Sequence, residues 1–287
     1  MTLTVTLLVL SAAVMHATWN AFVKAGNDKA AMQCLVIFLG GIPGLFILPF
    51  VPLPDPACWP YLIGSIVVHS IYYFTLVETY RHGSLSQAYP IARGSAPLLV
   101  ALFSMAAVGE YLSGGEWLGL IIACAGLISL AHVPHVVGVG TAQRSAEIRS
   151  IPFALATSLG IACYSILDGL GVRSTANGLS YISWLLVLEM IPVGLAFLWL
   201  RRGRIAATLK ENFSRGLFGG IIAGIGYGIV IWAMASAPLA HVSALRETSV
   251  ILAAIIGTLA LHEKFGPRRI AAAALVAAGN AMLHLAG

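Results

Sequence analysis

The sequence predicts an all-α integral membrane protein, on the basis of its composition, the length of its apolar runs and a repeat between its two halves. Of its 287 residues, 59% are hydrophobic and only 9% are charged, and the mean hydropathy is +0.91. Soluble domains carry about 25% charged residues, which cover the surface that faces water. Sixteen Lys and Arg with eleven Asp and Glu cannot cover a 30.1 kDa globule, so the composition excludes a soluble fold.

The apolar runs are long enough to cross a membrane. The hydrocarbon core of a bilayer requires about 20 apolar residues per helix, and ten such runs lie between polar, proline-rich or glycine-rich breaks. The ten predicted transmembrane helices cover residues 2–24, 31–51, 60–80, 86–108, 115–134, 151–171, 178–200, 214–236, 242–262 and 268–286.

The ten spans divide into two halves of five. The connections between spans are short, except for a polar, glycine-containing stretch that begins at His135. We therefore predict a first five-helix repeat at residues 1–134, a cytoplasmic linker at 135–150 and a second five-helix repeat at 151–287. A chain that contains both halves of a cavity could work as a monomer.

The two halves also match each other in sequence. A shift of 153 residues places Arg93 on Arg246, and a shift of 145 residues places Trp19 on Tyr164. Because each half has an odd number of spans, the second half must enter the membrane upside down relative to the first. This is the inverted-repeat plan of secondary transporters, whose binding site lies near the membrane midplane between the repeats.

The distribution of Lys and Arg predicts the orientation. Thirteen of the sixteen lie in the loops after spans 1, 3, 5, 7 and 9, only Arg173 lies in a loop on the opposite side, and two lie inside spans. Positively charged loops stay on the cytoplasmic side. We therefore predict a multi-pass protein of the inner (plasma) membrane with both termini on the non-cytoplasmic side.

Short motifs add a family resemblance over essentially the whole chain. A Trp-Asn pair lies in the first span (Ala17-Thr18-Trp19-Asn20), and a glutamate closes the fourth and ninth spans (Gly109-Glu110 and His262-Glu263). With the five-plus-five organisation, these motifs resemble the EamA branch of the drug/metabolite transporter superfamily. The resemblance implies an exporter of small metabolites, with amino acids, including aromatic ones, among its cargo. It also implies a basket-like helix bundle around a central cavity.

Charged residues inside spans are expected to have a function or a partner, because each one costs about 2.5 kcal/mol or more on insertion scales. In the predicted spans, Glu78 and Arg93 lie near the cytoplasmic side, and Asp168 and Arg246 lie near the outer side. We predict an inner gate pair of Glu78 with Arg93 and an outer gate pair of Asp168 with Arg246, which break and form in turn. Alternatively, both pairs are static and only hold helices together.

A second group of residues is expected to contact the substrate. Arg93 and Arg246 can each hold a carboxylate through two parallel hydrogen bonds, and aromatic rings can stack on planar groups or bind ammonium groups. Asn20 could hydrogen-bond the substrate or tie span 1 to its neighbour. The aromatic candidates are Trp19, Tyr72, Tyr73, Tyr89, Tyr164, Trp184 and Tyr227. The alternative for the small residues beside the arginines is close packing of helices.

Glu189 is the first candidate for proton coupling. It lies about eleven residues from each end of span 7, where a carboxylate in a low-dielectric environment can exchange a proton in each transport cycle. His16 and His69 are alternatives for the same task. A facilitator needs no such proton, and each of these side chains could instead hydrogen-bond a neighbouring helix.

The sequence favours a transporter over other classes of membrane protein. It has no clustered nucleophile, histidine and carboxylate set for a membrane-embedded enzyme, no nucleotide-binding motif and no metal-ligand spacing, so no cofactor is expected. Lys and Arg are not clustered as nucleic-acid binding requires. The expected partners are membrane lipid and a small substrate, with neutral or aromatic amino acids first and small anionic solutes, such as phosphonates or organic acids, second. A non-transport membrane protein is the remaining alternative.

Overall fold

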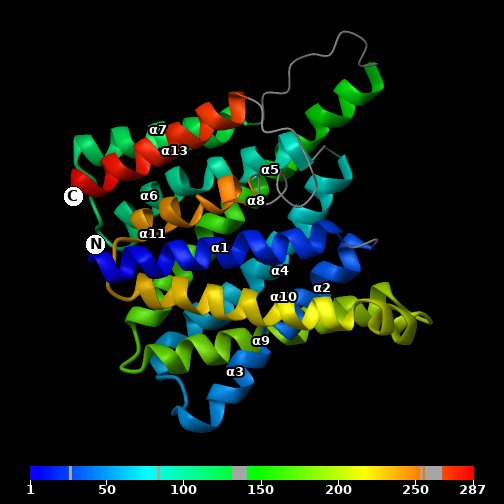
Figure 1. Ribbon diagram of the computed structural model, residues 1–287. Helices are drawn as coiled ribbons and strands as arrows, with labels where there is room; N and C mark the ends of the chain where they lie inside the picture. Colours follow the sequence, from blue (N-terminus) through cyan, green and yellow to red (C-terminus); the bar gives the residue numbers. More distant parts are fainter. Residues whose placement is uncertain (26–27, 83–84, 131–140, 253–254, 256–266) are drawn as a thin grey trace.

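In the computed structural model, most of the long helices run side by side, and both termini lie at the same end of the bundle (Figure 1). The structure describes residues 1–25, 28–82, 85–130, 141–252, 255 and 267–287. Within these residues, every regular element is an α-helix or a short 3₁₀-helix. The all-α prediction is therefore confirmed for the described part of the chain.

The described residues contain seven segments that are long and apolar enough to cross a membrane, and two shorter apolar helices. The long uninterrupted helices are α1 (Leu3–Ala25), α4 (Trp59–His82), α8 (Thr141–Arg173), α9 (Gly178–Leu200) and α10 (Ile205–Met234), and the two shorter apolar segments lie in α7 (Gly114–Ser129) and α13 (Pro267–Leu285). A multi-pass membrane protein is thereby confirmed. The count of ten spans stays a prediction, because part of the ninth span lies outside the described residues.

Two predicted spans are not single helices, which corrects the sequence analysis. The second span is divided into α2 (Lys29–Leu39), α3 (Ile42–Ile47) and the 3₁₀-helix η1 (Leu48–Phe50), and the fourth into α5 (Leu85–Gly94) and α6 (Ala96–Ala107). Pro43 and Pro97 lie at the starts of α3 and α6. A proline has no N–H to continue the helical hydrogen-bond ladder, which favours a break at these two places. Proline alone does not determine a break, because Pro152 and Pro192 lie inside the continuous helices α8 and α9.

The ninth span is also interrupted. Helix α11 (Leu239–Arg246) ends in a turn at Glu247 and Thr248, and helical structure resumes after that turn. The fourth span is interrupted at Ser95, two residues after Arg93. Because the 153-residue shift relates these two places, each half of the chain interrupts its fourth helix just after an arginine.

The connection between the halves differs from the predicted loop. Residues 141–150, which the sequence analysis placed in the linker 135–150, form the first turns of α8, and residues 135–140 lie outside the described part. This segment is rich in Ala, Gln, Arg and Glu, which favour helix formation. Helix α10 likewise begins at Ile205, nine residues before the predicted start, after a turn at Gly203 with a φ of 78°.

Helices from the two halves pack in matching pairs. Helix α1 packs along α10, and its counterpart α8 packs along α4, the counterpart of α10. Helix α7 packs along α13, as Figure 1 also shows, α2 and α3 pack on α9, and α6 packs on α11. At the level of whole spans, each pairing either maps onto itself or exchanges with another when the halves are exchanged, as an approximate two-fold relation between the repeats requires.

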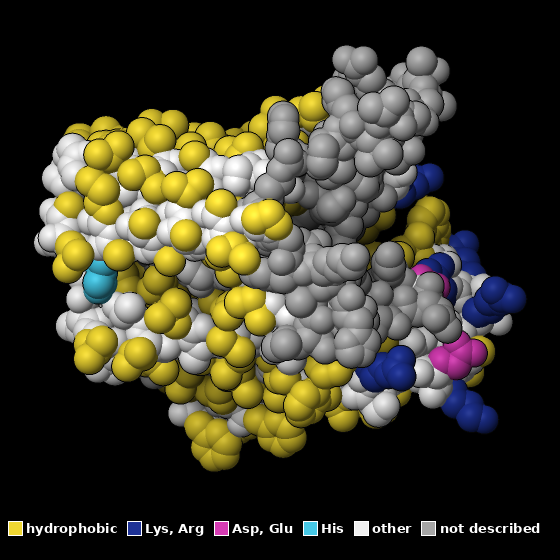
Figure 2. Space-filling model, turned by 45° about the horizontal axis from the view of Figure 1, so that its top comes forward, with side chains coloured by type: hydrophobic (Ala, Val, Ile, Leu, Met, Phe, Trp, Pro, Cys, Tyr) yellow, Lys and Arg dark blue, Asp and Glu magenta, His cyan; other side chains and the backbone are white. Residues whose placement is uncertain are grey.

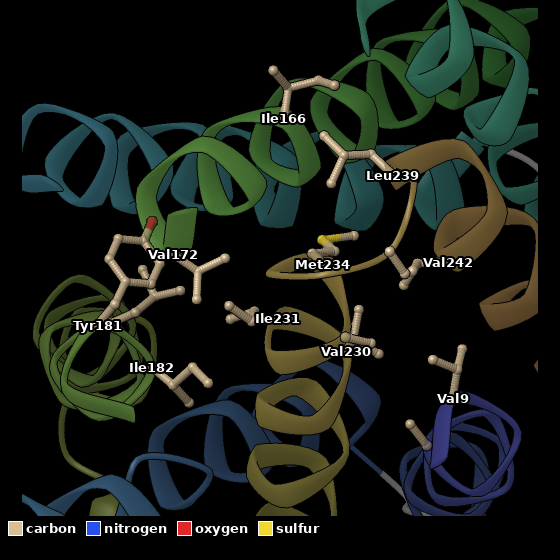
Figure 3. Packing of buried hydrophobic residues seen from close by; sticks show 14 of the residues in the cluster. Val9, Ile166, Val172, Tyr181, Ile182, Val230, Ile231, Met234, Leu239 and Val242 are labelled. Atoms are coloured by element: carbon tan, nitrogen blue, oxygen red, sulfur yellow. The ribbon is translucent and has the colours of Figure 1, made fainter. Parts of the chain in front are cut away.

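The largest apolar cluster joins helices of both halves. Its members come from α1, α8, α9, α10 and α11, among other elements, and include Val9, Ile166, Ile231 and Leu239 (Figure 3). Tyr181 is the largest fully buried side chain in the protein as described. The cluster lies beside the first turns of α1, so it fixes the end of the bundle where the chain begins.

The surface also fits a membrane protein. Figure 2 shows hydrophobic side chains over much of the sides of the bundle, whereas the described Lys and Arg side chains gather at one end. That end is opposite to the termini (Figures 1 and 2). Phe50 and Leu3 are examples of large apolar side chains that are mostly exposed. Contact with lipid explains such a surface, since soluble monomers rarely expose large apolar patches.

Glycines allow several helices of the two repeats to approach closely. An added Cβ on Gly224 of α10 would lie against the carbonyl oxygen of Gly40, which follows α2. At the α7–α13 contact, a Cβ on Gly119 would lie 2.7 Å from the carbonyl oxygen of Gly279. Backbone atoms cannot yield as a flexible side chain can, so these crossings depend on small residues, as is common between membrane helices.

We predict that Gly224→Ala lowers the stability of the protein by about 1–3 kcal/mol, because the added methyl group forces α10 away from α2. The measurement is thermal unfolding of the purified protein in detergent. Gly114→Ala is the matched control, because a Cβ there meets nothing within 4 Å. Equal melting temperatures for the two variants would contradict the close crossing.

Candidate functional site

A cavity of about 90 Å³ lies between helices of both repeats. Helices α1, α2, α4, α5, α8, α9, α10 and α11 each contribute side chains to its wall. Ten of the residues that the sequence analysis selected line this cavity: His16, Trp19, His69, Tyr72, Tyr73, Arg93, Tyr164, Glu189, Tyr227 and Arg246. The structure therefore brings most of the candidates to one place, while their roles in binding or coupling stay predictions.

Two of the candidates for substrate contact, Asn20 and Trp184, do not line the cavity. The Asn20 amide donates to the carbonyl of His16 in its own helix, at 2.8 Å. The ring of Trp184 packs against Trp59, with 5.9 Å between the ring centroids, and it joins the edge of the apolar cluster. The side chain of Tyr89 lies outside the described residues.

The two repeat-related arginines meet at one carboxylate. The Nε atom of Arg93 lies 2.6 Å from Oε2 of Glu247, and the Nε atom of Arg246 lies 3.5 Å from Oε1 of the same residue. All three side chains are buried, and Glu247 has no exposed surface. The interruptions of the fourth and ninth spans position this cluster, because Arg93 and Arg246 lie at the ends of α5 and α11.

The predicted inner gate pair is not formed. Arg93 pairs with Glu247, whereas Glu78 accepts a hydrogen bond from Nη1 of Arg81 at 2.7 Å and lies 3.4 Å from His82. These two partners are one turn away from Glu78 on the same helix. A local pair of this kind orders few additional torsions, so Glu78 is satisfied at the end of α4 without reaching Arg93.

The predicted outer gate pair is not formed either. Asp168 is fully buried and accepts hydrogen bonds from the hydroxyl groups of Tyr181, at 3.0 Å, and Tyr227. Arg246 instead pairs with the adjacent Glu247, and its guanidinium carbon lies 5.7 Å from the ring centroid of Tyr164. The two phenols satisfy Asp168 at short range, which is why this carboxylate needs no arginine in the present conformation.

The carboxylate of Glu189 lies beside His69. The Nδ1 atom of His69 is 3.3 Å from Oε1 of Glu189 and 3.0 Å from the carbonyl oxygen of Ser65. The His69 ring stacks on Tyr164 with 4.0 Å between centroids, and the same tyrosine ring lies next to Arg246. The cavity wall therefore runs from a guanidinium group through two stacked rings to a carboxylate.

His16, the other candidate for proton coupling, lies on α1. Its ring contacts the ring of Trp19 edge-on, with 4.9 Å between centroids, and both residues line the cavity. The structure thus places two histidines and one carboxylate at a single cavity. No group of three or more His, Cys, Asp or Glu side chains that could hold a metal ion occurs among the residues that the structure describes.

The sequence analysis gave no role to Glu247 or Tyr181. Glu247 could have been found, because it is an intramembrane carboxylate next to Arg246, and the 153-residue shift places it on Gly94, beside Arg93. Tyr181 has no comparable signal. Its contact with Asp168 depends on how α8 and α9 face each other, which no local pattern encodes.

A second polar network closes the end of the bundle that holds the termini. Arg173, the one cation that the sequence analysis placed in an outer loop, pairs with Glu110 at 2.8 Å and donates to the carbonyl oxygens of Met234 and Ala237, each at 2.8 Å. Glu110 also accepts from the backbone N–H of Leu239 at 2.8 Å. One arginine and one glutamate thereby connect the end of α10 and the start of α11 to α8 and to the loop before α7.

The fold and the cavity define the protein as a polytopic membrane protein whose two repeats both contribute charged and aromatic side chains to one cavity. The chain belongs to the EamA-like transporter family, whose model matches residues 3–131 and 148–285. Members of this family are membrane transporters of the drug/metabolite type rather than enzymes.

Solved structures support the fold alone. One of them, described only as the crystal structure of a protein, is 18% identical to this chain, with a TM-score of 0.80 and coverage of 99% of each chain. No curated protein matches the sequence.

We predict that Arg93 and Glu247 contribute jointly to the free energy of unfolding, whereas Arg93 and Glu78 contribute independently. In a double-mutant cycle of Arg93→Gln with Glu247→Gln, the interaction energy is expected to be about 1–3 kcal/mol, because the two buried side chains are in direct contact at 2.6 Å. The measurement is unfolding of the detergent-purified variants. The matched cycle uses Glu78→Gln and is expected to give less than about 0.5 kcal/mol. A larger interaction energy for Arg93 with Glu78 than for Arg93 with Glu247 would contradict this pairing and support the predicted inner gate pair.

Proposed function

We propose that this transporter exports small amphipathic metabolites from the cell, with neutral and aromatic amino acids as its substrate class. One observation carries the proposal: the same cavity has two guanidinium groups, a carboxylate and several aromatic rings in its wall. An amino acid has the complementary groups, a carboxylate at one end and an ammonium at the other.

The two ends of the cavity suggest how an amino acid would bind. Its carboxylate would accept hydrogen bonds from Arg93 and Arg246, since a guanidinium group can hold a carboxylate in a bidentate way. Its ammonium group would lie toward Glu189 and the tyrosine rings, where ionic and cation-π contacts favour a cation. The stacked rings of His69 and Tyr164 lie between these two ends.

The volume of the cavity bears on the size of the substrate. About 90 Å³ accommodates several water-sized probes, each of which occupies roughly 10–15 Å³. A small amino acid fits a cavity of this volume, whereas an amino acid with an aromatic side chain requires a conformation of the protein in which the cavity is larger. Such a change is expected of a protein that exposes one site to the two sides of a membrane in turn.

The interrupted helices are suitable hinges for alternating access. The interruptions at Ser95 and Thr248 adjoin the two arginines, so rocking one repeat against the other would change the access to the site and the positions of Arg93 and Arg246 together. In the present conformation, the network of Glu110 with Arg173 joins helices at the end that holds the termini. We assign that end to the non-cytoplasmic side of the inner membrane, because the positive charges lie at the other end.

The adjacent arginines also support a second candidate substrate class. Two guanidinium groups within reach of one carboxylate could serve a small anion of the phosphonate or organic-acid type equally well. The carboxylate of Glu189 does not favour this alternative, because it would repel a second negative charge.

We predict saturable uptake of radiolabelled neutral or aromatic amino acids by proteoliposomes that contain the purified protein. If Glu189 couples transport to protons, a pH gradient will accelerate uptake by the wild type, and Glu189→Gln will remove the dependence on the gradient while it retains exchange at equal pH. A protein that works as a facilitator will show no effect of the gradient in either variant.

The control is Glu211→Gln, which removes an exposed carboxylate of α10 far from the wall of the cavity. This variant is expected to keep both uptake and its response to the gradient. Absence of uptake for every amino acid tested, together with uptake of small anions, would replace the first substrate class with the second.

A further inference from the structure

The connection between α9 and α10 carries a group of cationic side chains. It lies at the end of the bundle opposite to the termini (Figure 1), where the described Lys and Arg gather (Figure 2). Arg202 and Arg204 lie in the turn, and Lys210 and Arg215 lie in the first three turns of α10. All four side chains are exposed, and we refer to these four residues as the basic cluster. Glu211 is the one acidic residue of this segment.

The basic cluster does not hold the described part of the protein together. Other cations at this end have carboxylate partners, since Arg81 pairs with Glu78 at 2.7 Å and Arg201 pairs with Asp28 at 2.5 Å. No ion pair or side-chain hydrogen bond joins the basic cluster to a residue that the structure describes. Its cationic groups are therefore available to an anion from outside the protein.

The basic cluster lies where the surface of the helices changes from apolar to charged. Leu195 and Trp199 of α9 and Phe218 of α10 are mostly exposed. Such apolar side chains face lipid in a membrane protein, and Trp collects where the hydrocarbon meets the lipid head groups. The guanidinium carbon of Arg202 lies 6.0 Å from the centroid of the Trp199 ring, so this cation lies at the same boundary.

The length of α10 also places the basic cluster among the head groups. Its 30 residues form a helix about 45 Å long, at about 1.5 Å per residue. The hydrocarbon core of a bilayer is about 30 Å thick. The excess of about 15 Å corresponds to about three turns, and the first three turns are the polar ones. Lys210 and Arg215 therefore lie at the depth of the lipid phosphates.

The repeated fold does not require these cations. A shift of 149 residues places Pro43 on Pro192, and the same shift places residues 52–66 on residues 201–215. The segment 52–66 connects the equivalent helices of the first repeat and contains no Lys or Arg. The basic cluster is thus a property of one repeat and of one end of the bundle.

We propose that the basic cluster binds the head groups of anionic phospholipids in the adjoining leaflet. A guanidinium group can hold a phosphate through two parallel hydrogen bonds, and four or more Lys and Arg next to a transmembrane helix attract anionic lipid. A zwitterionic lipid also has a phosphate, but its own cation cancels the net charge. This inference goes beyond the proposed function and does not depend on the identity of the substrate.

The experiment measures lipid binding to the detergent-purified protein by native mass spectrometry. The two lipids are dioleoylphosphatidylglycerol, which is anionic, and dioleoylphosphatidylcholine, which is zwitterionic and has the same acyl chains. The wild type is expected to bind the anionic lipid about tenfold more tightly or better. This preference should decrease as the ionic strength rises, because salt screens exposed charges.

The test variant combines Arg202→Gln, Arg204→Gln, Lys210→Gln and Arg215→Gln. A Lys or Arg near an anionic membrane surface contributes about fivefold in affinity. The affinity for the anionic lipid is therefore expected to fall by about 25-fold or more, while binding of the zwitterionic lipid stays the same. The single variant Arg202→Gln, with an expected loss of about fivefold, tests the proposal if the fourfold variant does not fold.

Arg81→Gln is the matched control, because it removes an exposed arginine that lies outside the basic cluster and already pairs with Glu78. It should leave the lipid preference unchanged. Equal affinities of the wild type for the two lipids, a preference that survives in the fourfold variant, or an equal loss in Arg81→Gln would each overturn the inference. Displacement of the anionic lipid by inorganic phosphate at constant ionic strength would assign the basic cluster to a soluble anion and overturn it as well.

Discussion

The constraint on which the site depends is the burial of two arginines inside a membrane protein. A buried cation is tolerated only when it is paired or faces a polar cavity, and Arg93 and Arg246 do both. Each lines the cavity and lies within 4 Å of the same carboxylate, Glu247. One glutamate thus contacts both arginines and helps to hold their guanidinium groups at the cavity wall.

The fold brings this cluster together through the relation between its halves. The arginines belong to different repeats, at the ends of α5 and α11, and both spans are interrupted within two residues of the arginine. Packing of α6 on α11 joins these two interrupted spans across the interface between the repeats. The positions of the two helix breaks therefore determine where Arg93 and Arg246 meet Glu247. A movement of either repeat would move one of the arginines of the site.

The sequence was sufficient to predict the helical membrane fold, most of the cavity residues and the equivalence of Arg93 with Arg246, because apolar runs, intramembrane charges and a repeat are all visible in a linear chain. It did not predict which charges pair. Pairing depends on the rotation of each helix about its axis. As a result, Glu78 pairs with Arg81 on its own helix, and Asp168 accepts hydrogen bonds from two tyrosines. The prolines Pro43 and Pro97 indicate possible helix breaks, whereas hydropathy alone predicts one continuous span at each place.

The most direct test of the account is an experimental structure with a bound amino acid. The account predicts that the carboxylate of the ligand lies within hydrogen-bond distance of both Arg93 and Arg246, with its ammonium group toward Glu189 and with Glu247 still in contact with both guanidinium groups. A ligand that contacts neither arginine, or a structure in which the two arginines face separate cavities, would contradict it.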